Sequence, residues 1–326
     1  MAAFNRAYKG LHGYLAVVVC VFGIIANILN IAVLTRKNMI SATNCILTGL
    51  AVSDGLTMVA YLPFALRFYV LYGTESSIER NTAGAMRFLL FYACFSVVVH
   101  TVSIWLTVTL AVFRYIFIKY PRQGAVLCSL FRAKVAVFLV YVITLVVCIP
   151  NFVTITVQGE PQSSNGTTAV LWFVGFKMET KADKFIHDFN FWIQAILVKL
   201  VPCFGLTILS ILLVQTMKRA EARRKNLRQK SAPAPSASSS ADSSTRDRKT
   251  NRTTRMLLSV VVLFLLTEFP QGILNLLSGL LECFVNEVYN PLGDFMDILA
   301  LINNGINFLL YCTMSKQFRD TFIEVF

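Results

Sequence analysis

Four ionisable residues, Asp54, Arg114, Glu268 and Asp297, lie inside long apolar stretches of this sequence. A charge at membrane depth is costly, so each of these residues needs a partner or a function. A carboxylate such as Asp54 can hold a small cation when hydroxyl and amide oxygens surround it. The sequence therefore offers a sodium site, and a structural hydrogen-bond network is an alternative that is compatible with it. The candidate sodium ligands are Asp54, Ser103, Asn303 and Asn307.

The other two acids point to the binding of a ligand. Glu268 comes two residues before Pro270, which removes a backbone donor and should kink its helix, and Asp297 follows Asp294 at about one helical turn. Together these carboxylates predict an acidic vestibule that suits a cationic ligand. For His100, a structural partner inside the membrane is the alternative. The candidate ligand-binding residues are Glu268, Asp297, Asp294, His100, Gln194, Gln271, Phe269, Tyr61 and Phe95.

The composition indicates that a membrane surrounds these residues. Hydrophobic residues make up 56% of the chain and charged residues 14%, and the mean hydropathy is +0.63. A bilayer core of ~30 Å needs roughly 20 helical residues, and an unclosed sheet would leave backbone groups unsatisfied in lipid. We therefore predict an all-α fold, a seven-transmembrane helix bundle followed by a short amphipathic helix eight. The predicted spans are 13–34, 45–72, 85–118, 135–157, 185–217, 254–283 and 291–313. The first is too long for the core of a secretory signal.

Basic residues predict the orientation of the bundle. When residues 36–41, 121–134, 218–253 and 314–326 are placed on one side, that side gathers 20 of the 30 Lys and Arg, counting the two at its borders. The positive-inside bias makes this side cytoplasmic, so we expect an extracellular N-terminus and a location in the plasma membrane. The net charge of +13 is then a topology signal, and no nucleic-acid partner is needed to explain it.

The segments outside the spans differ in composition. We expect residues 1–12 to form an extracellular tail and residues 13–313 to form the transmembrane domain. The middle of the cytoplasmic loop 218–253 is rich in Ala, Pro and Ser and cannot build a core, so we expect partial disorder, either as a linker or as a phosphorylation surface. Residues 314–326 place three phenylalanines and a valine on one helical face, which favours a helix lying on the membrane.

Two observations concern the outer loop, residues 158–184. Asn165 begins an Asn-Gly-Thr triplet, which is an acceptor pattern for N-glycosylation. None of the eight cysteines falls in this loop, so we expect no disulfide to fasten it.

Motifs along the whole chain resemble those of the rhodopsin-like (class A) G-protein-coupled receptors, in the right order and on the right helices. They are Asn27, Leu50 to Asp54, Arg114 with Tyr115, Pro202, Phe264 with Phe269 and Pro270, and Asn307 to Tyr311. A narrower resemblance links the chain to the invertebrate myosuppressin-type receptors, which respond to FMRFamide-like peptides. It rests on residues 103–116, 253–258, 267–272, 297–303 and 314–319.

This resemblance implies a receptor for an amidated neuropeptide that ends in Arg-Phe-amide, and no enzyme activity. We expect the arginine of such a peptide to pair with Glu268 or Asp297. The implied partners are membrane lipids, a heterotrimeric G protein of the inhibitory class, and arrestin and kinases. The residues implied in G-protein contact or activation are Arg114, Tyr115, Lys119, Asn307, Tyr311, Phe264 and Pro270.

The chain departs from the usual rhodopsin-like pattern at three positions of the activation switch. Phe113 stands where most such receptors have an acid before the arginine. Glu268 replaces the usual tryptophan before the helix-six proline, and Phe308 replaces a proline in the helix-seven motif. These substitutions fit the myosuppressin-type subgroup.

Other protein classes explain the sequence less well. A transporter or channel could use Asp54, Glu268 and Asp297 as an ion path, but seven spans give no pair of inverted halves. A zinc hydrolase would need three histidines at one depth, and the three in this chain lie at different depths. A monoamine receptor needs an acid within residues 85–112 and an opsin needs a lysine within residues 291–313, and the sequence has neither.

Overall fold

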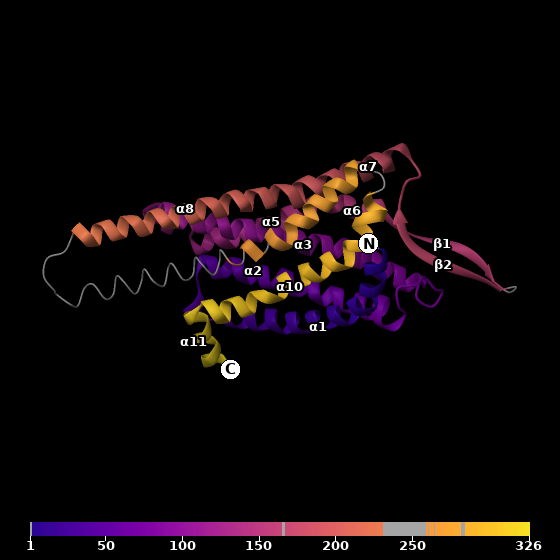
Figure 1. Cartoon of the computed structure of the whole chain (residues 1–326), viewed down its shortest axis with the longest axis horizontal. Helices are drawn as coiled ribbons and strands as arrows, with labels where there is room; N and C mark the ends of the chain where they lie inside the picture. Colours follow the sequence, from indigo (N-terminus) through magenta and orange to yellow (C-terminus); the bar gives the residue numbers. More distant parts are fainter. Residues whose placement is uncertain (1, 165–166, 231–258, 260, 264, 282–283) are drawn as a thin grey trace.

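The computed structural model describes residues 2–164, 167–230, 259, 261–263, 265–281 and 284–326. Its long helices lie side by side, with a β-hairpin at one end of the bundle and helix α11 at the other (Figure 1). We call these the hairpin end and the α11 end. Within the described residues, seven helical segments are long and apolar enough to cross a membrane, which confirms the predicted fold. They are Tyr8–Leu34, Ala42–Leu71, Ala83–Lys119, Leu130–Thr154, Lys181–Arg219, Val261–Leu280 and Glu287–Met314.

The elements follow one another along the chain. The first are α1 (Ala2–Leu34), α2 (Ala42–Ala65), α3 (Ala83–Lys119), α4 (Pro121–Leu127), α5 (Leu130–Val147) and α6 (Ile149–Thr154). The hairpin strands β1 (Ile155–Ser164) and β2 (Thr167–Phe176) come next. Then follow α7 (Lys181–Trp192), α8 (Val201–Lys230), the span Val261–Leu280, α10 (Asn290–Met314) and α11 (Lys316–Val325). Wider π-helical turns occupy Leu66–Leu71, Ile193–Leu200 and Val285–Tyr289, and a 3₁₀ turn occupies Lys37–Met39.

Hydroxyl side chains set five of the helix starts. In each case the side-chain oxygen accepts a hydrogen bond from the backbone N–H three residues further on, which satisfies a donor that the helix itself cannot. The capping residues are Ser41, Thr82, Ser129, Thr180 and Ser315. At Thr180 the bond is reciprocal, because the Asp183 carboxylate accepts from the Thr180 N–H.

Helices α1 and α10 approach each other closely at two glycines. A Cβ atom on Gly23 would overlap the Met58 sulfur, and the Cα of Gly305 lies 3.4 Å from the same point. Small residues allow helix backbones to come close in a membrane, where van der Waals packing drives association. Met58 is fully buried and belongs to a core cluster with Tyr61 and Leu301. The helices α1, α2 and α10 therefore form one tightly packed layer.

The β-hairpin is the main difference from the predicted architecture. The fourth span was predicted to continue to Val157, but α6 ends at Thr154 and β1 begins at Ile155. The segment Ile155 to Val157 is entirely β-branched, and such side chains favour strands over helices. The hairpin is antiparallel and pairs Gly159 with Trp172.

Trp172 fixes the hairpin to the bundle. Its backbone N–H donates to the carbonyl oxygen of Asn81 at 3.2 Å, just before the start of α3. Trp172 also packs, together with Val157, against a buried cluster that contains Phe68 and Met86. None of the seven described cysteines forms a disulfide, so in the described residues this attachment is non-covalent.

Arg80 holds the loop under the hairpin in place. Its guanidinium lies 4.9 Å from the centre of the Phe68 ring, and it donates to the carbonyl oxygen of Gly73 and to the side-chain oxygen of Asn81, both at 3.0 Å. Gly73 has φ +66°, a conformation that favours glycine. Burial lowers the pKa of the Arg80 guanidinium, but arginine stays charged in proteins. The loop therefore presents Asn81 to the hairpin as a fixed acceptor.

The terminal segments differ in part from the predictions. Residues 2–12, within the predicted tail, continue α1 as helix. The amphipathic helix eight is confirmed as α11, in which Phe318 is buried against Tyr311 while Ile323 is exposed. Helix α8 extends to Lys230, and the rest of the predicted loop, 231–253, lies outside the described residues. Asn165 also lies outside them.

Candidate functional site

A cavity of about 300 Å³ lies between the helices below the hairpin end. One wall carries Asp297 together with the rings of Tyr61, Tyr92 and Tyr289. The other wall carries polar groups from α3, the Ile193–Leu200 turn and the Val261–Leu280 span. These groups are His100, Gln194, Lys199, Gln271 and Asn275. We call this space the hairpin-end cavity. Its volume and its mixture of aromatic and polar walls are typical of ligand pockets.

A buried ion pair supports the polar wall of the hairpin-end cavity. Lys199 Nζ lies 2.7 Å from Glu268 Oε2, and it also donates to Gln271 Oε1 at 2.9 Å. Glu268 is 0% exposed and Lys199 is 8% exposed, so solvent screens this interaction little. A buried charge is stable only when it is paired and hydrogen-bonded. Lys199 therefore neutralises Glu268.

His100 joins this ion pair from α3. Its Nε2 atom lies 3.1 Å from Glu268 Oε2 and 2.9 Å from Lys199 Nζ. One imidazole nitrogen cannot donate to the carboxylate and accept from the ammonium at the same time, so the ring serves one partner or the other. The three residues bring α3, the Ile193–Leu200 turn and the Val261–Leu280 span together at one point. His100 thus has polar partners inside the bundle and also lines the hairpin-end cavity.

Asp297 stands apart from this pair. It is half-buried, it lines the cavity beside Tyr61, and no ion pair to it occurs among the described residues. Asp294, one turn away, is engaged differently, because its Oδ1 accepts from the Tyr69 hydroxyl at 2.6 Å. Tyr61 in turn contacts the fully buried His12, with 2.9 Å between the hydroxyl oxygen and His12 Nε2. Asp297 is therefore the acid that the cavity offers to a ligand.

Asp54 forms the centre of a second polar site, deeper in the bundle. Its Oδ1 accepts from the Ser103 hydroxyl at 2.7 Å, and its Oδ2 accepts from the Asn307 amide at 3.0 Å. A small cavity of about 10 Å³ adjoins them and is also lined by Asn303 and Asn304. Such a volume is close to the smallest that holds one water molecule. The four predicted ligands thus lie together, and their carboxylate, hydroxyl and amide oxygens fit a small hard cation.

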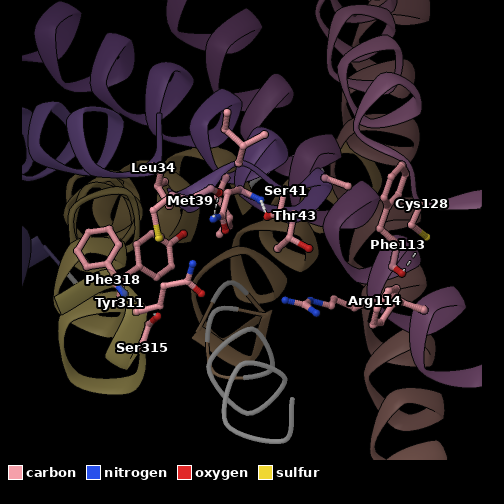
Figure 2. A pocket seen from close by; sticks show the side chains of 16 residues that line it. Leu34, Met39, Ser41, Thr43, Phe113, Arg114, Cys128, Tyr311, Ser315 and Phe318 are labelled. Atoms are coloured by element: carbon pink, nitrogen blue, oxygen red, sulfur yellow. Dashed lines mark hydrogen bonds between the residues drawn. The ribbon is translucent and has the colours of Figure 1, made fainter. Parts of the chain in front are cut away.

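A third cavity, of about 540 Å³, opens at the α11 end. Figure 2 shows Arg114 pointing into it from α3, with Tyr311 and Phe318 on the opposite side. Arg114 Nε has no hydrogen-bond partner among the described residues, and no ion pair to Arg114 occurs within them. The preceding residue, Phe113, packs against the apolar core and supplies no charge. We call this space the Arg114 cavity.

Comparison with known proteins assigns the chain to a family. The family model described as "Serpentine type 7TM GPCR chemoreceptor Srw" matches residues 14–326. The chain belongs to this family of G-protein-coupled receptors. It is 30% identical to the G-protein coupled receptor dmsr-1 of Caenorhabditis elegans, over 98% of this chain and 68% of that protein.

Two relatives from Drosophila melanogaster are also similar to this receptor. The sex peptide receptor is 28% identical, over 97% of this chain and 72% of its own length. The FMRFamide receptor is 25% identical, over 99% of this chain and 55% of its own length. The family confirms the resemblance to G-protein-coupled receptors that was drawn from the motifs, and it makes the chain a multi-pass receptor of the plasma membrane with a G protein as partner.

The structure gathers some of the predicted ligand-binding residues and separates others. His100, Gln194, Gln271, Asp297 and Tyr61 line the hairpin-end cavity of the receptor. Among the described residues, Glu268, Asp294, Phe269 and Phe95 do not line it. Glu268 is occupied by Lys199, which corrects the expectation that it offers a free carboxylate to a ligand.

The two predicted phenylalanines pack elsewhere. Phe95 stacks on Phe91 with 5.4 Å between the ring centres, and Phe91 is 55% exposed. Phe269 makes an edge contact with Phe204, which is also 55% exposed. Phe91 and Phe204 thus present large apolar side chains at the outer surface of the bundle, where a membrane span meets lipid. Aromatic residues in a membrane span need not face the interior, and this is why sequence alone misplaced these two.

The residues implied in activation also fall into separate places. Arg114 and Tyr311 line the Arg114 cavity, and Asn307 belongs to the Asp54 site. Lys119 donates to the Tyr115 hydroxyl at 2.6 Å, on an exposed part of α3. Pro270 lies in the Val261–Leu280 span and lines none of the three cavities, and Phe264 lies outside the described residues.

Sequence reasoning missed the pairing of Lys199 with Glu268. A signal for it was present, because one lysine in the middle of the fifth span and one acid in the middle of the sixth can neutralise each other. It also missed Tyr92, Asn275 and Tyr289 as lining residues. These three side chains carry no charge, so the cost of burying a charge gave no sign that they point into the bundle.

Proposed function

We propose that this receptor binds an amidated neuropeptide ending in Arg-Phe-amide through the hairpin-end cavity. The observation that carries the proposal is Asp297, a cavity-lining acid without an ion-pair partner among the described residues, whereas Glu268 is already neutralised by Lys199. A peptide guanidinium can pair with the Asp297 carboxylate through charge-assisted hydrogen bonds. The name of the Drosophila FMRFamide receptor supports this ligand class.

The remaining walls of the cavity match the rest of such a ligand. The rings of Tyr61, Tyr92 and Tyr289 offer surfaces for a phenylalanine side chain. The side-chain amides of Gln271 and Asn275 can donate to and accept from a terminal carboxamide. This proposal requires the hairpin end to face outwards, and the gathering of basic residues towards the α11 end supports that orientation.

The pairing can be tested with one residue change and one peptide change. We expect Asp297→Asn to weaken activation by an Arg-Phe-amide peptide about tenfold or more, because a charge-assisted hydrogen bond is lost. A peptide with citrulline in place of arginine should activate the wild-type receptor equally weakly. Its potency should not fall further on Asp297→Asn. The readout is ligand-driven G-protein dissociation in cells.

Asp294→Asn is the matched control for this experiment. Asp294 is a neighbouring acid of the same helix, but it is bonded to Tyr69 and does not line the cavity. The Asp294→Asn receptor should respond to both peptides almost as the wild type does. Equal responses of Asp297→Asn and wild type to the arginine peptide would refute the pairing.

Two parts of the proposal concern the signal. Coupling to an inhibitory G protein is supported by the resemblance to myosuppressin-type receptors, and a ligand-driven rise in cyclic AMP would contradict it. At the Asp54 site, Asp54, Ser103, Asn303 and Asn307 would hold a sodium ion, which would supply a cation to that carboxylate. Sodium should then lower agonist affinity in the wild type but not in Asp54→Asn, and equal sodium dependence would rule the site out.

A further inference from the structure

The hairpin-end cavity is lined by one acid and one base. Among the described residues that line it, Asp297 is the sole aspartate or glutamate and Lys199 is the sole lysine or arginine. Taken alone, these two charges would suit a ligand that carries both a cation and an anion, such as a peptide that ends in an arginine followed by a residue with a free carboxyl terminus. A third charge, which lies behind the wall, changes this count.

Glu268 is that third charge. It does not line the cavity and is 0% exposed, and its Oε2 atom lies 2.7 Å from Lys199 Nζ. An anion brought to the wall near Lys199 would be attracted by the ammonium and repelled by the carboxylate behind it, and at this separation the two effects largely cancel. Histidine is ordinarily uncharged near neutral pH, so His100 does not alter this balance. The wall near Lys199 therefore acts as a neutral surface.

The hydrogen bonds of Lys199 lead to the same conclusion. An ammonium group has three N–H bonds. The Nζ atom lies 2.7 Å from Glu268 Oε2, 2.9 Å from Gln271 Oε1 and 2.9 Å from His100 Nε2. When the His100 ring serves the ammonium as an acceptor, all three N–H bonds are in use. Lys199 then has no donor left for the carboxylate of a ligand, which would enter the cavity without a partner for its charge.

A carboxamide, in contrast, finds partners at this wall. Gln271 uses its Oε1 atom for Lys199, so its amide N–H groups are what it can offer to a ligand oxygen. Asn275 lines the same wall and can both donate and accept. A neutral end group is satisfied by such dipoles, whereas burying a carboxylate without a counter-charge is far more costly. The wall thus favours a carboxamide over a carboxylate.

We propose that the pair of Lys199 and Glu268 sets the selectivity of the receptor for a neutral carboxamide end over a free carboxylate end. Lys199 holds Gln271 in place, and Glu268 cancels the charge that would otherwise attract a carboxylate. Among the described lining residues Asp297 remains as the one uncompensated charge, so the ligand end that fits carries one positive charge and no negative one. This inference rests on the proposed function, because it concerns the end group of the same peptide in the same cavity.

Three peptides of one sequence test the inference on the wild type. They end in Arg-Phe as the amide, the free acid and the methyl ester. The ester is neutral like the amide but has no terminal N–H, so it separates the effect of charge from that of hydrogen bonding. In competition binding to membranes, we expect the acid to bind about a hundredfold more weakly than the amide, and the ester to stay within about tenfold of the amide. An ester as weak as the acid would overturn the inference, because charge would then not decide.

Removal of the Glu268 charge should open the cavity to the acid peptide. Glu268→Gln keeps the shape of the side chain and leaves the ammonium of Lys199 uncompensated. The affinity for the acid, relative to that for the amide, should then rise about tenfold or more. Both affinities are measured on the same receptor, so a smaller amount of folded variant does not affect their ratio. An unchanged ratio would contradict the inference.

Two further variants separate charge from packing. Lys199→Met combined with Glu268→Leu removes both charges and should keep the preference for the amide, whereas a loss of preference equal to that in Glu268→Gln would show that packing sets it. Asp294→Asn also removes one negative charge, but Asp294 is bonded to Tyr69 and does not line the cavity, so this variant should keep the wild-type ratio. A rise in Asp294→Asn as large as in Glu268→Gln would mean that overall charge, and not the pair, governs the choice of end group.

The outcomes also distinguish this inference from the proposed function. A wild type that binds none of the three peptides would refute the proposed function, and the inference with it. A wild type that binds the amide, together with a Glu268→Gln variant that still rejects the acid, would refute the inference alone.

Discussion

At the scale of single residues, the buried charges of this receptor fall into two kinds. Glu268 and Lys199 lie 2.7 Å apart, almost without exposure to solvent, and neutralise each other inside the bundle. Asp297 and Arg114 each line a cavity and have no ion-pair partner among the described residues. The neutralised pair is suited to holding helices together, and the two unpaired residues are suited to contact with a ligand and a G protein.

Removal of Lys199 should be strongly destabilising. Lys199→Ala leaves Glu268 charged and buried, and breaking a buried pair in this way costs about 3–5 kcal/mol. The double variant Lys199→Met with Glu268→Leu removes both charges and should regain most of this stability. Thermal unfolding of the purified receptor measures both effects.

The matched control for this prediction is Lys184→Ala, which removes an exposed lysine of α7. It should unfold at the temperature of the wild type. A double variant no more stable than Lys199→Ala would mean that the pair contributes through its packing and not through its charges.

At the scale of elements, the β-hairpin projects from one end of the helix bundle (Figure 1). The hydrogen bond from Trp172 to Asn81, and the packing of Trp172 near Phe68 and Met86, attach it to the start of α3. A Cβ on Gly159, across the strand pair, would come within 3.0 Å of the Trp172 ring. The anchor thus depends on one large and one minimal side chain facing each other.

Trp172→Ala should release the hairpin and speed the dissociation of a bound peptide. A loss of about 1.4 kcal/mol at the anchor corresponds to dissociation about tenfold faster. Trp172→Phe keeps a ring in the same place and should change the rate less. Dissociation of a labelled peptide from membranes measures the rate, with Trp192→Ala, in α7, as the control.

Because the attachment described here is non-covalent, a reducing agent should leave the dissociation rate of the wild type unchanged. A rate that rises with dithiothreitol would show that a disulfide contributes after all. An unchanged rate in Trp172→Ala would mean that the hairpin does not limit the escape of the ligand.

Hydropathy explains why the helices could be predicted and the hairpin could not. Each span is a run of at least 20 residues with few charges, a signal that little else in a sequence imitates. The hairpin strands are 10 residues each and lie between two such runs, so their alternation is short and competes with the end of the fourth span. The site was harder still, because hydropathy does not reveal which face of a helix turns inwards.

At the scale of the whole molecule, Arg114 bears on the balance between resting and active states. A ligand shifts this balance only by binding one state better than the other, and contacts within the chain set its starting point. Phe113 packs against the apolar core and offers no carboxylate to Arg114. The position before Arg114 therefore contributes packing to this balance and no ion pair.

Phe113→Asp should lower the basal signal of the receptor. A carboxylate at this position can pair with Arg114 and keep its guanidinium from a G protein. We expect a clear fall in ligand-independent G-protein activation, with the response to the peptide shifted to higher concentrations.

Phe113→Asn is the control for the charge, because it removes the same ring and adds a polar group of the same size. It should lower the basal signal less than Phe113→Asp does. Equal effects of the two variants would mean that the loss of packing, and not a new ion pair, changes the balance.

The pairing of Glu268 with Lys199 also bears on how the receptor responds to electrical activity in a cell. A single charge that crosses the transmembrane field gains or loses about 2.3 kcal/mol for each 100 mV, enough to shift a two-state equilibrium about fiftyfold. A movement that leaves the pair intact transports no net charge from these two residues. Depolarisation therefore does no work on this pair as long as its two members move together.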